Sequence, residues 1–478
     1  MREQGDCTLS APVLPSQGEL VSIYVDHCHP LLQLKGALPW EAIEALMVAA
    51  WRKAGKNVAG SRGKAWPVSL YVPLLVLMLI KRLDSREKVP GEAGMETYLT
   101  ENAVARVFIG QQQQPVPHIR DHANIARALA ALGAQGVEEV NKLILVQATQ
   151  LGFADPSVLS GDTTCQELPI GYPHEAGIIK GIAQRCARAL LRIKKRGIAS
   201  VDGAILQAKE VLKTAKHYHL FAKGKEEKDQ LLRQMMQTSE SLMEQTSAVV
   251  AQLGAGGERV VKAVVVKLNI MKQVTETLLP QIEHWLSTGY VASGKILHAG
   301  LLQAKAIVRN KAGKKVEFGL PYLINRLGGG YVFGKLLDKI PAESRMPLES
   351  LKGYRDIFGP KATPELFVYD RGGHSQATIK KLEKQGVKKI GIQPKGQAEW
   401  CVAEEDQKRV VSERSRTEGV IGTLKSESYK FNKPKERRWD MVQAAGQRSI
   451  LSLNLNKLMR DIVTKDKDAR QVQFQTAA

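Results

Sequence analysis

The sequence predicts an α/β protein in which a long helical block interrupts the series of strands. Runs of β-branched and aromatic residues, typical of strands, occur near residues 157–167 and again between residues 300 and 393. Ahead of the first run and between the two, apolar residues recur at helical spacing. The 478 residues, 44% of them hydrophobic, suffice for roughly two or three domains with buried cores.

The N-terminal part is expected to be helical up to about residue 151. Residues 1–34 have mixed composition, so we expect loose order there. Pro115 and Pro117, after four glutamines, mark a loop. Asp121 or His118 could cap the helix that follows. The expected helices are residues 40–54, 68–83, 95–108, 122–132 and 137–151.

The block from about residue 173 to 286 is expected to consist of helices 175–196, 201–221, 226–253 and 258–279. The last helix contains three consecutive valines, but the surrounding spacing still favours helix. A Gly-rich turn at 254–257 favours an antiparallel pair. Lys262, Lys267 and Lys272 recur at intervals of five and spread around the helix, which favours a protein contact over a DNA contact.

The C-terminal part returns to strands that alternate with helices. We expect strands at residues 300–309, 315–324, 331–337, 365–370 and 389–393. We expect helices at residues 348–358, 375–385, 408–425 and 441–459. The glycines at 328–330 indicate a hairpin or bulge. The implied domains are residues 1–150, 151–172, 173–291 and 292–478, of which the second and fourth form one α/β core.

Three acidic residues are the strongest candidates for a functional site. Asp162 lies in the predicted first strand, and Asp370 ends the apolar run at residues 366–369. Glu418 lies in a helix where Arg414 and Lys425 fall within roughly 40° of it on the helical wheel. Each has a purely structural alternative, namely a turn aspartate or an exposed ion pair. Together, two strand acids and one helix acid could hold two divalent metals about 4 Å apart for attack on a phosphodiester.

The acids in this order resemble the DDE transposases of bacterial insertion sequences, which have an RNase H-like catalytic core. Arg414-x3-Glu418-x6-Lys425 matches three letters of the tyrosine-arginine-glutamate-lysine signature of one large group. Val411 stands where that signature has Tyr.

Further segments extend the resemblance over roughly residues 150–170 and 295–460. Residues 370–372 match the usual Asp-Arg-Gly, with Gly373 in place of the common aromatic residue. Residues 311–319 resemble a hairpin common in these enzymes. Residues 454–456 resemble an asparagine-leucine pair near the family's C-terminus.

The resemblance implies an RNase H-like mixed sheet with flanking helices, an all-helical N-terminal domain and a helical insertion. It implies that Asp162, Asp370 and Glu418 are catalytic and bind two Mg²⁺ ions, for which Mn²⁺ can substitute. The implied activity is metal-dependent cleavage and strand transfer at the terminal inverted repeats of an insertion sequence. Two alternatives are a nuclease without strand transfer and a non-catalytic DNA-binding protein derived from a transposase.

The expected partner is double-stranded DNA, bound by a homodimer. A net charge of +21 and a pI near 9.6 favour a polyanion, although ribosomal and membrane-surface proteins share such a charge. The basic segment 429–439 interleaves cations with aromatic residues, unless it is simply a solvated loop. The helical block is either a structural bundle or an element of assembly. The candidate DNA contacts are Arg371, Arg414, Lys425, Lys430, Lys433, Lys435, Arg437 and Arg438, and Gly422 would let the DNA backbone approach.

Other features make several classes of protein less favoured. Five cysteines without zinc-site spacing predict a reduced, cytoplasmic protein. The most apolar stretch, residues 67–80, is too short to span a bilayer, so no membrane association is expected. The sequence has no P-loop, so no nucleotide cofactor is expected.

Overall fold

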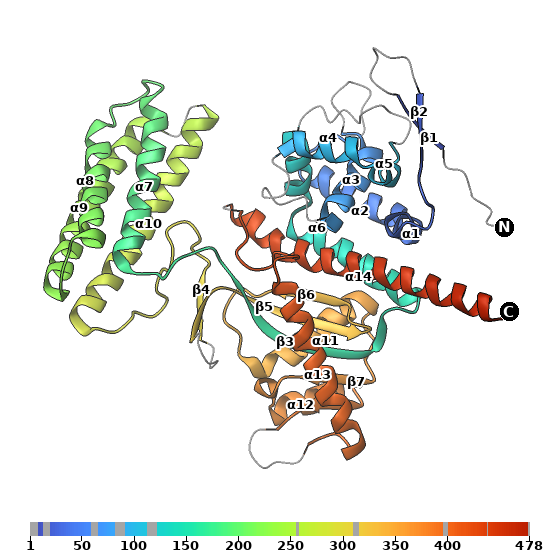
Figure 1. The fold of residues 1–478 in the computed structure, drawn as a ribbon. Coiled ribbons are helices and arrows are strands. Elements are labelled where there is room, and N and C mark those ends of the chain that lie inside the picture. Colours follow the sequence, from blue (N-terminus) through green and yellow to red (C-terminus); the bar gives the residue numbers. More distant parts are fainter. Residues whose placement is uncertain are drawn as a thin grey trace. The chain divides into compact units, whose positions relative to one another are not determined.

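The computed structural model describes residues 8–12, 20–58, 66–81, 91–111, 122–254, 258–308, 315–394, 400–436 and 438–476. The chain divides into two compact units (Figure 1). Unit 1 comprises Met1–Pro169 and Leu320–Ala478, and unit 2 comprises Ile170–Gly319. The expected residues 311–314 of the hairpin, Pro115, Pro117 and the two candidate caps lie outside the described residues.

A mixed six-stranded sheet gives the protein its α/β class, as the sequence predicted. The strands are β3 (Asp155–Glu167), β4 (Lys305–Val308), β5 (Val316–Gly328), β6 (Val332–Leu336), β7 (Leu366–Tyr369) and β8 (Lys389–Ile392). Their order is β4-β5-β3-β7-β8, with β6 also paired to β5. The β3–β7 and β7–β8 pairs are parallel, whereas β4–β5 and β5–β6 are antiparallel. Strand β5 passes from unit 2 into unit 1.

The turn between β5 and β6 confirms the hairpin predicted from the glycines. Gly329 and Gly330 have φ angles of 79° and 90°, which glycine adopts without the strain that a side chain would cause. The backbone N–H of Leu327 donates to the carbonyl of Tyr331 at 2.8 Å and closes the turn.

Helices cover both faces of the sheet in unit 1. They are α11 (Met346–Phe358), α12 (Gln376–Lys384), α13 (Glu404–Lys425) and α14 (Trp439–Thr476). A Cβ built on Gly161 of β3 would lie 2.8 Å from Ser350 Oγ of α11, whereas the preceding Ser160 hydrogen-bonds to Thr417 of α13. Because successive strand residues point to opposite faces, α11 and α13 cover opposite faces of β3.

The N-terminal region differs from the sequence prediction at two places. Strands β1 (Thr8–Pro12) and β2 (Leu20–Tyr24) form an antiparallel pair where loose order was expected. The predicted helix 95–108 is broken at Asn102, because that side chain accepts from the N–H of Ala105 and starts a new helix. At Gly133 a φ of 65° interrupts the helical backbone within α6, which confirms the predicted break between helices 122–132 and 137–151. The helices of this region are α1 (Pro30–Ala37), α2 (Trp40–Lys53), α3 (Val68–Lys81), α4 (Gly91–Glu101), α5 (Ala103–Phe108) and α6 (His122–Gln150).

The N-terminal helices share one hydrophobic core with the sheet and α14. Helix α14 packs against α1, α3 and α6 and is much longer than the predicted helix 441–459. Asn454 holds it in place by donating to Asn141 Oδ1 at 2.7 Å and to the carbonyl of Val332 at 2.6 Å. Asn456 donates to the carbonyl of Ile80 at 3.0 Å. The asparagine motif therefore fastens α14 to α6, β6 and α3.

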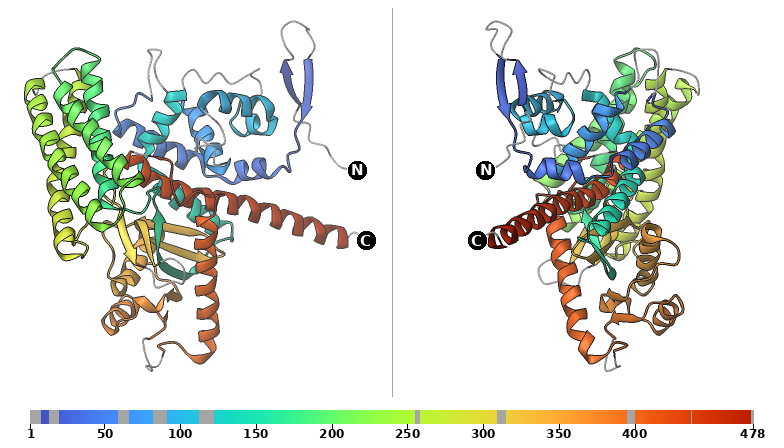
Figure 2. Two further views of the ribbon diagram at one scale, coloured as in Figure 1. Left: turned by 60° about the vertical axis from the view of Figure 1, so that its left-hand side comes forward. Right: turned by 90° about the vertical axis from the view of Figure 1, so that its right-hand side faces the viewer.

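Unit 2 contains the predicted helical block as four long helices with a hydrophobic core of their own. They are α7 (Glu175–Lys194), α8 (Asp202–Leu220), α9 (Lys225–Leu253) and α10 (Arg259–Thr288), and they lie side by side in every view (Figures 1 and 2). The predicted end at residue 279 is wrong, since α10 continues through Pro280. Leu278 and Ile282, buried on either side of that proline, keep the helix on the core and offset the lost hydrogen bond.

In the described part of the chain, no helix combines the length and apolar character needed to cross a membrane.

Candidate active site

The register of two parallel strands places Asp162 and Asp370 next to each other. In the β3–β7 pair, Ser160 is opposite Val368 and Gly161 is opposite Tyr369. Asp162 follows Gly161, and Asp370 follows Tyr369, so the two acids are the next pair along the two strands. Adjacent strands lie about 4.8 Å apart, and residues in register point to the same face. Both carboxylates therefore lie on one face of the sheet, Asp370 where β7 ends and Asp162 midway along β3.

Helix α13 brings Glu418 to the same face. The helix packs against both β3 and β7. The buried side of α13, which includes Thr417, contacts the sheet. Glu418 is the next residue and lies at the border of that side, with 61% of its side chain exposed. One depression, with about 190 Å³ of empty space including the part open to solvent, is lined by Ser160, Gly161, Asp162, Asp370, Arg414, Thr417 and Glu418. The structure thus brings the three sequence-predicted acids together.

Arg414 is the charged residue that links two of these acids. Its Nη2 contacts Asp370 Oδ1, and its Nε lies 3.5 Å from Glu418 Oε1. The guanidinium is 39% exposed, and it places positive charge between two carboxylates that would otherwise repel each other. Asp370 also accepts from the N–H of Gly372 at 3.3 Å.

The donor set suits a hard divalent cation, because carboxylate oxygens are the ligands that Mg²⁺ prefers. In the described ranges, no three His, Cys, Asp or Glu side chains are grouped closely enough to hold one metal ion. A cation held by Asp370 and Glu418 together would displace the Arg414 guanidinium, which contacts both carboxylates.

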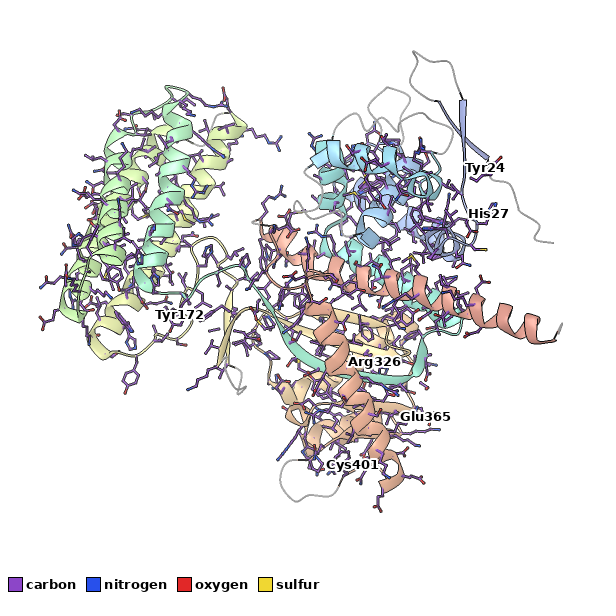
Figure 3. All side chains as sticks on the ribbon, viewed as in Figure 1. Tyr24, His27, Tyr172, Arg326, Glu365 and Cys401 are labelled. Carbon is purple, nitrogen blue, oxygen red and sulfur yellow. The ribbon has the colours of Figure 1, made fainter. Side chains whose placement is uncertain are left out.

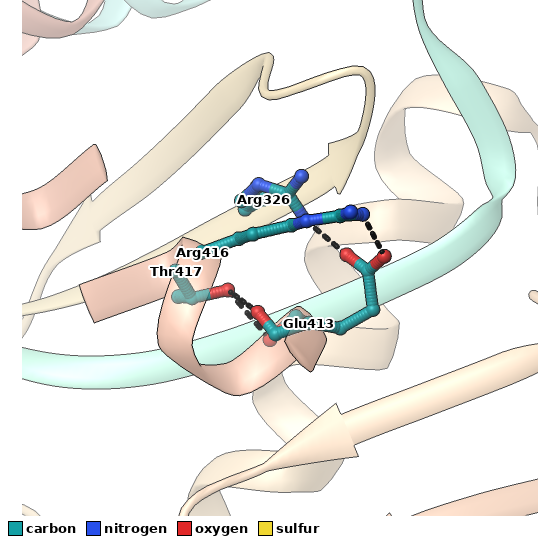
Figure 4. Close-up of polar contacts among 5 residues, drawn as sticks. Arg326, Glu413, Arg416 and Thr417 are labelled. Atoms are coloured by element: carbon teal, nitrogen blue, oxygen red, sulfur yellow. Dashed lines mark hydrogen bonds and ion pairs between the residues drawn. The ribbon is translucent and has the colours of Figure 1, made fainter. Parts of the chain in front are cut away.

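A buried ion pair behind the site was not predicted from the sequence. Glu413 of α13 and Arg326 of β5 form it, and their side chains are only 7% and 5% exposed. The Nη1 of Arg416 also lies 2.7 Å from Glu413. Figure 4 shows the Glu413 carboxylate held by both arginines, and Figure 3 labels Arg326 among the elements of unit 1. The pair joins the site helix to the central sheet one turn before Glu418.

The hydroxyl oxygens of Thr417 and Ser160 provide a second tie, at 2.7 Å. Both residues are buried, and each precedes a candidate acid, by one position in the helix and by two in the strand. In the sequence the two residues are recognisable only as small polar residues near an acid, which is a weak signal.

A fourth carboxylate, Glu343, lies behind the other face of the sheet edge. Thr163 donates to its Oε1 at 2.6 Å, and its side chain packs 3.5 Å from the position of a Cβ on Gly372. Burial, followed by the charges of Glu343, Asp162 and Asp370, raises the pKa of Tyr369 well above its ordinary value. Tyr369 is therefore a neutral phenol packed among these carboxylates. The sequence contained no signal for Glu343.

The basic segment is placed differently from the prediction. Phe431 is fully buried with its ring centroid 5.1 Å from that of Tyr322, so it cannot stack on DNA bases. The segment is fastened to β3, where the N–H of Lys433 donates to the carbonyl of Glu167 at 2.7 Å. Arg438 pairs with Asp440. The prediction that aromatic residues alternate with cations on the surface is therefore wrong at Phe431.

The remaining candidate DNA contacts do not line the depression, and several of them are exposed to solvent. Arg371, Lys433 and Lys435 are exposed, while Lys425 and Lys430 are half-buried. Lys425 ends α13, about 10 Å along the helix from Glu418, and does not line the depression. Arg437 lies outside the described residues.

The two positions that depart from the resembled motif, Gly373 and Val411, have different surroundings. A Cβ on Gly373 would lie 2.5 Å from Cδ1 of Tyr369, so the ring of Tyr369 already fills the space beside this residue. Val411 is 58% exposed on α13, so a larger side chain there would meet solvent. Gly422 is exposed, and nothing lies within 4 Å of a Cβ built on it.

Comparisons of the chain with protein-family models, curated proteins and solved structures give no match.

Proposed function

We propose that the chain is a DDE transposase with an RNase H-like core, which binds the ends of an insertion sequence, cleaves them and joins them to target DNA. The observation that carries this proposal is the meeting of Asp162, Asp370 and Glu418 in one depression. Asp162 lies within β3, Asp370 directly follows the parallel strand β7, and Glu418 lies on α13, although 208 and 48 positions separate them in the chain (370 − 162 and 418 − 370).

The three carboxylates would hold two Mg²⁺ ions, or Mn²⁺ in their place. Bound there, the metal would lower the pKa of an attacking water or 3′-hydroxyl and stabilise the leaving oxygen. The side chain of Arg414 would release Asp370 and Glu418 and turn to a DNA phosphate, to which a guanidinium donates two parallel hydrogen bonds. The chain's own contribution is therefore to position acids, phosphate and nucleophile on a rigid sheet edge.

DNA would approach over the exposed edge of α13. Gly422 leaves room there, and the exposed Arg371, Lys433 and Lys435 supply cations around the sheet edge. Joining two DNA ends needs two active sites, so the DNA-bound form is proposed to be a homodimer. The proposed compartment is the cytoplasm, which suits a chain whose five cysteines have no zinc-site spacing and are odd in number.

The test is incubation of the protein with Mg²⁺ and a labelled fragment that carries the element's ends. We expect cleaved and strand-transferred products with Mg²⁺ or Mn²⁺ and without any nucleotide. Asp162→Asn, Asp370→Asn and Glu418→Gln should each abolish both products and leave DNA binding intact, because binding rests on many separate phosphate contacts.

The outcomes separate the alternatives. Cleavage without joined products would identify a nuclease on the same scaffold. Specific DNA binding without any cleavage would identify a non-catalytic DNA-binding protein. A variant of one acid that cleaves at the wild-type rate would remove that acid from the site.

A further inference from the structure

The helical unit has a strongly uneven distribution of charge. Residues 176–196, which are α7 without its first residue Glu175 together with the two residues that follow the helix, contain seven Lys or Arg and no acid. Residues 259–275 of α10 contain four Lys or Arg and no acid. By contrast, α9 (residues 225–253) contains five acids and three Lys or Arg. Since α7 packs directly against α10, the positive charge is concentrated where these two helices meet.

Four of these cations form what we term the α7–α10 basic stripe: Arg185, Arg188, Arg192 and Lys267. The three arginines are spaced three and four positions apart, which puts them on one face of α7. Lys267 faces them from α10, and its pKa is lowered by burial and then by the charges of Arg185, Arg192 and Arg188.

The stripe is both supported and accessible. The guanidinium of Arg185 packs against the backbone of Gly300. A Cβ built on Gly300 would come within 1.5 Å of Arg185 Nη2. Arg188 and Arg192 are exposed. Gathering like charges opposes folding, and a polyanion bound along the stripe would relieve that repulsion.

We propose that the α7–α10 basic stripe binds the phosphate backbone of double-stranded DNA. From Arg185 to Arg192 the stripe is about 10 Å long, and a duplex presents a phosphate charge about every 1.7 Å along its axis, so several phosphates lie within reach. The choice of DNA as the polyanion rests on the proposed function, whereas the stripe itself does not. Lys262, Lys267 and Lys272 spread around α10, but Lys267 also lies close to the arginines of α7.

The test compares two charge-matched variants of the full-length protein. Arg188→Ala/Arg192→Ala removes two exposed cations from the stripe, and Lys209→Ala/Lys216→Ala removes two exposed cations from α8. Binding to a fluorescent duplex is measured by anisotropy over a series of salt concentrations. The stripe variant should bind about tenfold more weakly, and its log K against log salt slope should be lower by about two. The α8 variant should behave nearly as the wild type.

Three results bear on the proposal in different ways. Equal binding by the stripe variant and the α8 variant would overturn it. Loss of binding to phosphatidylserine vesicles, with duplex binding unchanged, would assign the stripe to a membrane surface and also overturn it. The conservative Arg188→Lys/Arg192→Lys variant should keep the salt slope, which a fold defect would not allow.

The same measurement distinguishes this proposal from the proposed function. Asp370→Asn should bind the duplex with the wild-type salt slope whatever its effect on cleavage. If that variant still cleaves, the proposed active site fails and the stripe stands. If Arg188→Ala/Arg192→Ala binds the duplex as the wild type does and Asp370→Asn does not cleave, the proposal for the stripe fails and the proposed active site stands.

Discussion

The hydroxyl oxygens of Ser160 and Thr417 lie 2.7 Å apart and share a hydrogen bond that joins strand β3 to helix α13. The two residues are 257 positions apart in the chain. Thr417 directly precedes Glu418, and Ser160 lies on the same strand face as Asp162. This contact therefore sets the distance between two candidate metal ligands.

Thr417→Val should destabilise the protein by about 1–3 kcal/mol, because it leaves the buried Ser160 hydroxyl without this partner. Cleavage should slow more than DNA binding weakens, since Glu418 loses its fixed position. Urea unfolding and single-turnover cleavage rates measure the two effects. In the double variant with Ser160→Ala, stability should return close to the wild type because both polar groups are gone. Additive losses in the double variant would show that the two residues act separately.

Breaking the buried pair behind the site should cost more. Arg326→Met leaves the buried Glu413 with only the partly exposed Arg416, and removing one partner of a buried pair costs about 3–5 kcal/mol. Arg416→Ala, whose side chain is 60% exposed, should cost about 1 kcal/mol or less. Urea midpoints of the two variants give the comparison. Similar midpoints would mean that Arg326 contributes no more than a surface partner.

From the sequence, the functional residues could be predicted on one face of α13, whereas the residues that attach the other face to the sheet could not. Spacing on the helical wheel correctly related Arg414 to Glu418, because that relation is local and needs only the helical period. Glu413 and Thr417 are significant through Arg326 and Ser160, which lie on strands far away in the chain. Nothing in the spacing of residues 404–425 indicates those partners, since they depend on how helix and sheet pack.

The strand pairing shows the same division. The apolar run before Asp370 and the turn after it were enough to place that acid at the end of a strand. Its neighbour Asp162 could be inferred only through a resemblance, because parallel pairing across a 208-residue gap (370 − 162) has no local signal. Glu343 escaped prediction for the same reason, since it meets Thr163 only through the fold.

Removing Arg414 should strengthen divalent-cation binding and weaken catalysis. The guanidinium occupies the space between Asp370 and Glu418, so Arg414→Ala removes a competing cation. The concentration of Mn²⁺ that raises the melting temperature half-maximally should fall, whereas cleavage at saturating Mg²⁺ should slow because a phosphate contact is lost. Lys425→Ala, on the same helix but away from the depression, should leave the Mn²⁺ concentration unchanged. An unchanged Mn²⁺ requirement in Arg414→Ala would mean that the guanidinium does not compete with metal.

Gly422 provides the sharpest test of where DNA passes over α13. Gly422→Ala meets no atom within 4 Å and replaces a helix-interior glycine, so it should stabilise the protein by about 0.5–1 kcal/mol. If the DNA backbone lies against this position, the added methyl group should nevertheless weaken duplex binding and slow cleavage. Gly419→Ala is the matched control, because Gly419 is equally open but lies about 100° around the helix from Glu418, against about 40° for Gly422. Melting curves should show a similar gain for both variants, and anisotropy should show weaker binding for Gly422→Ala alone. Equal duplex affinity in the two variants would place the DNA away from this face of the helix.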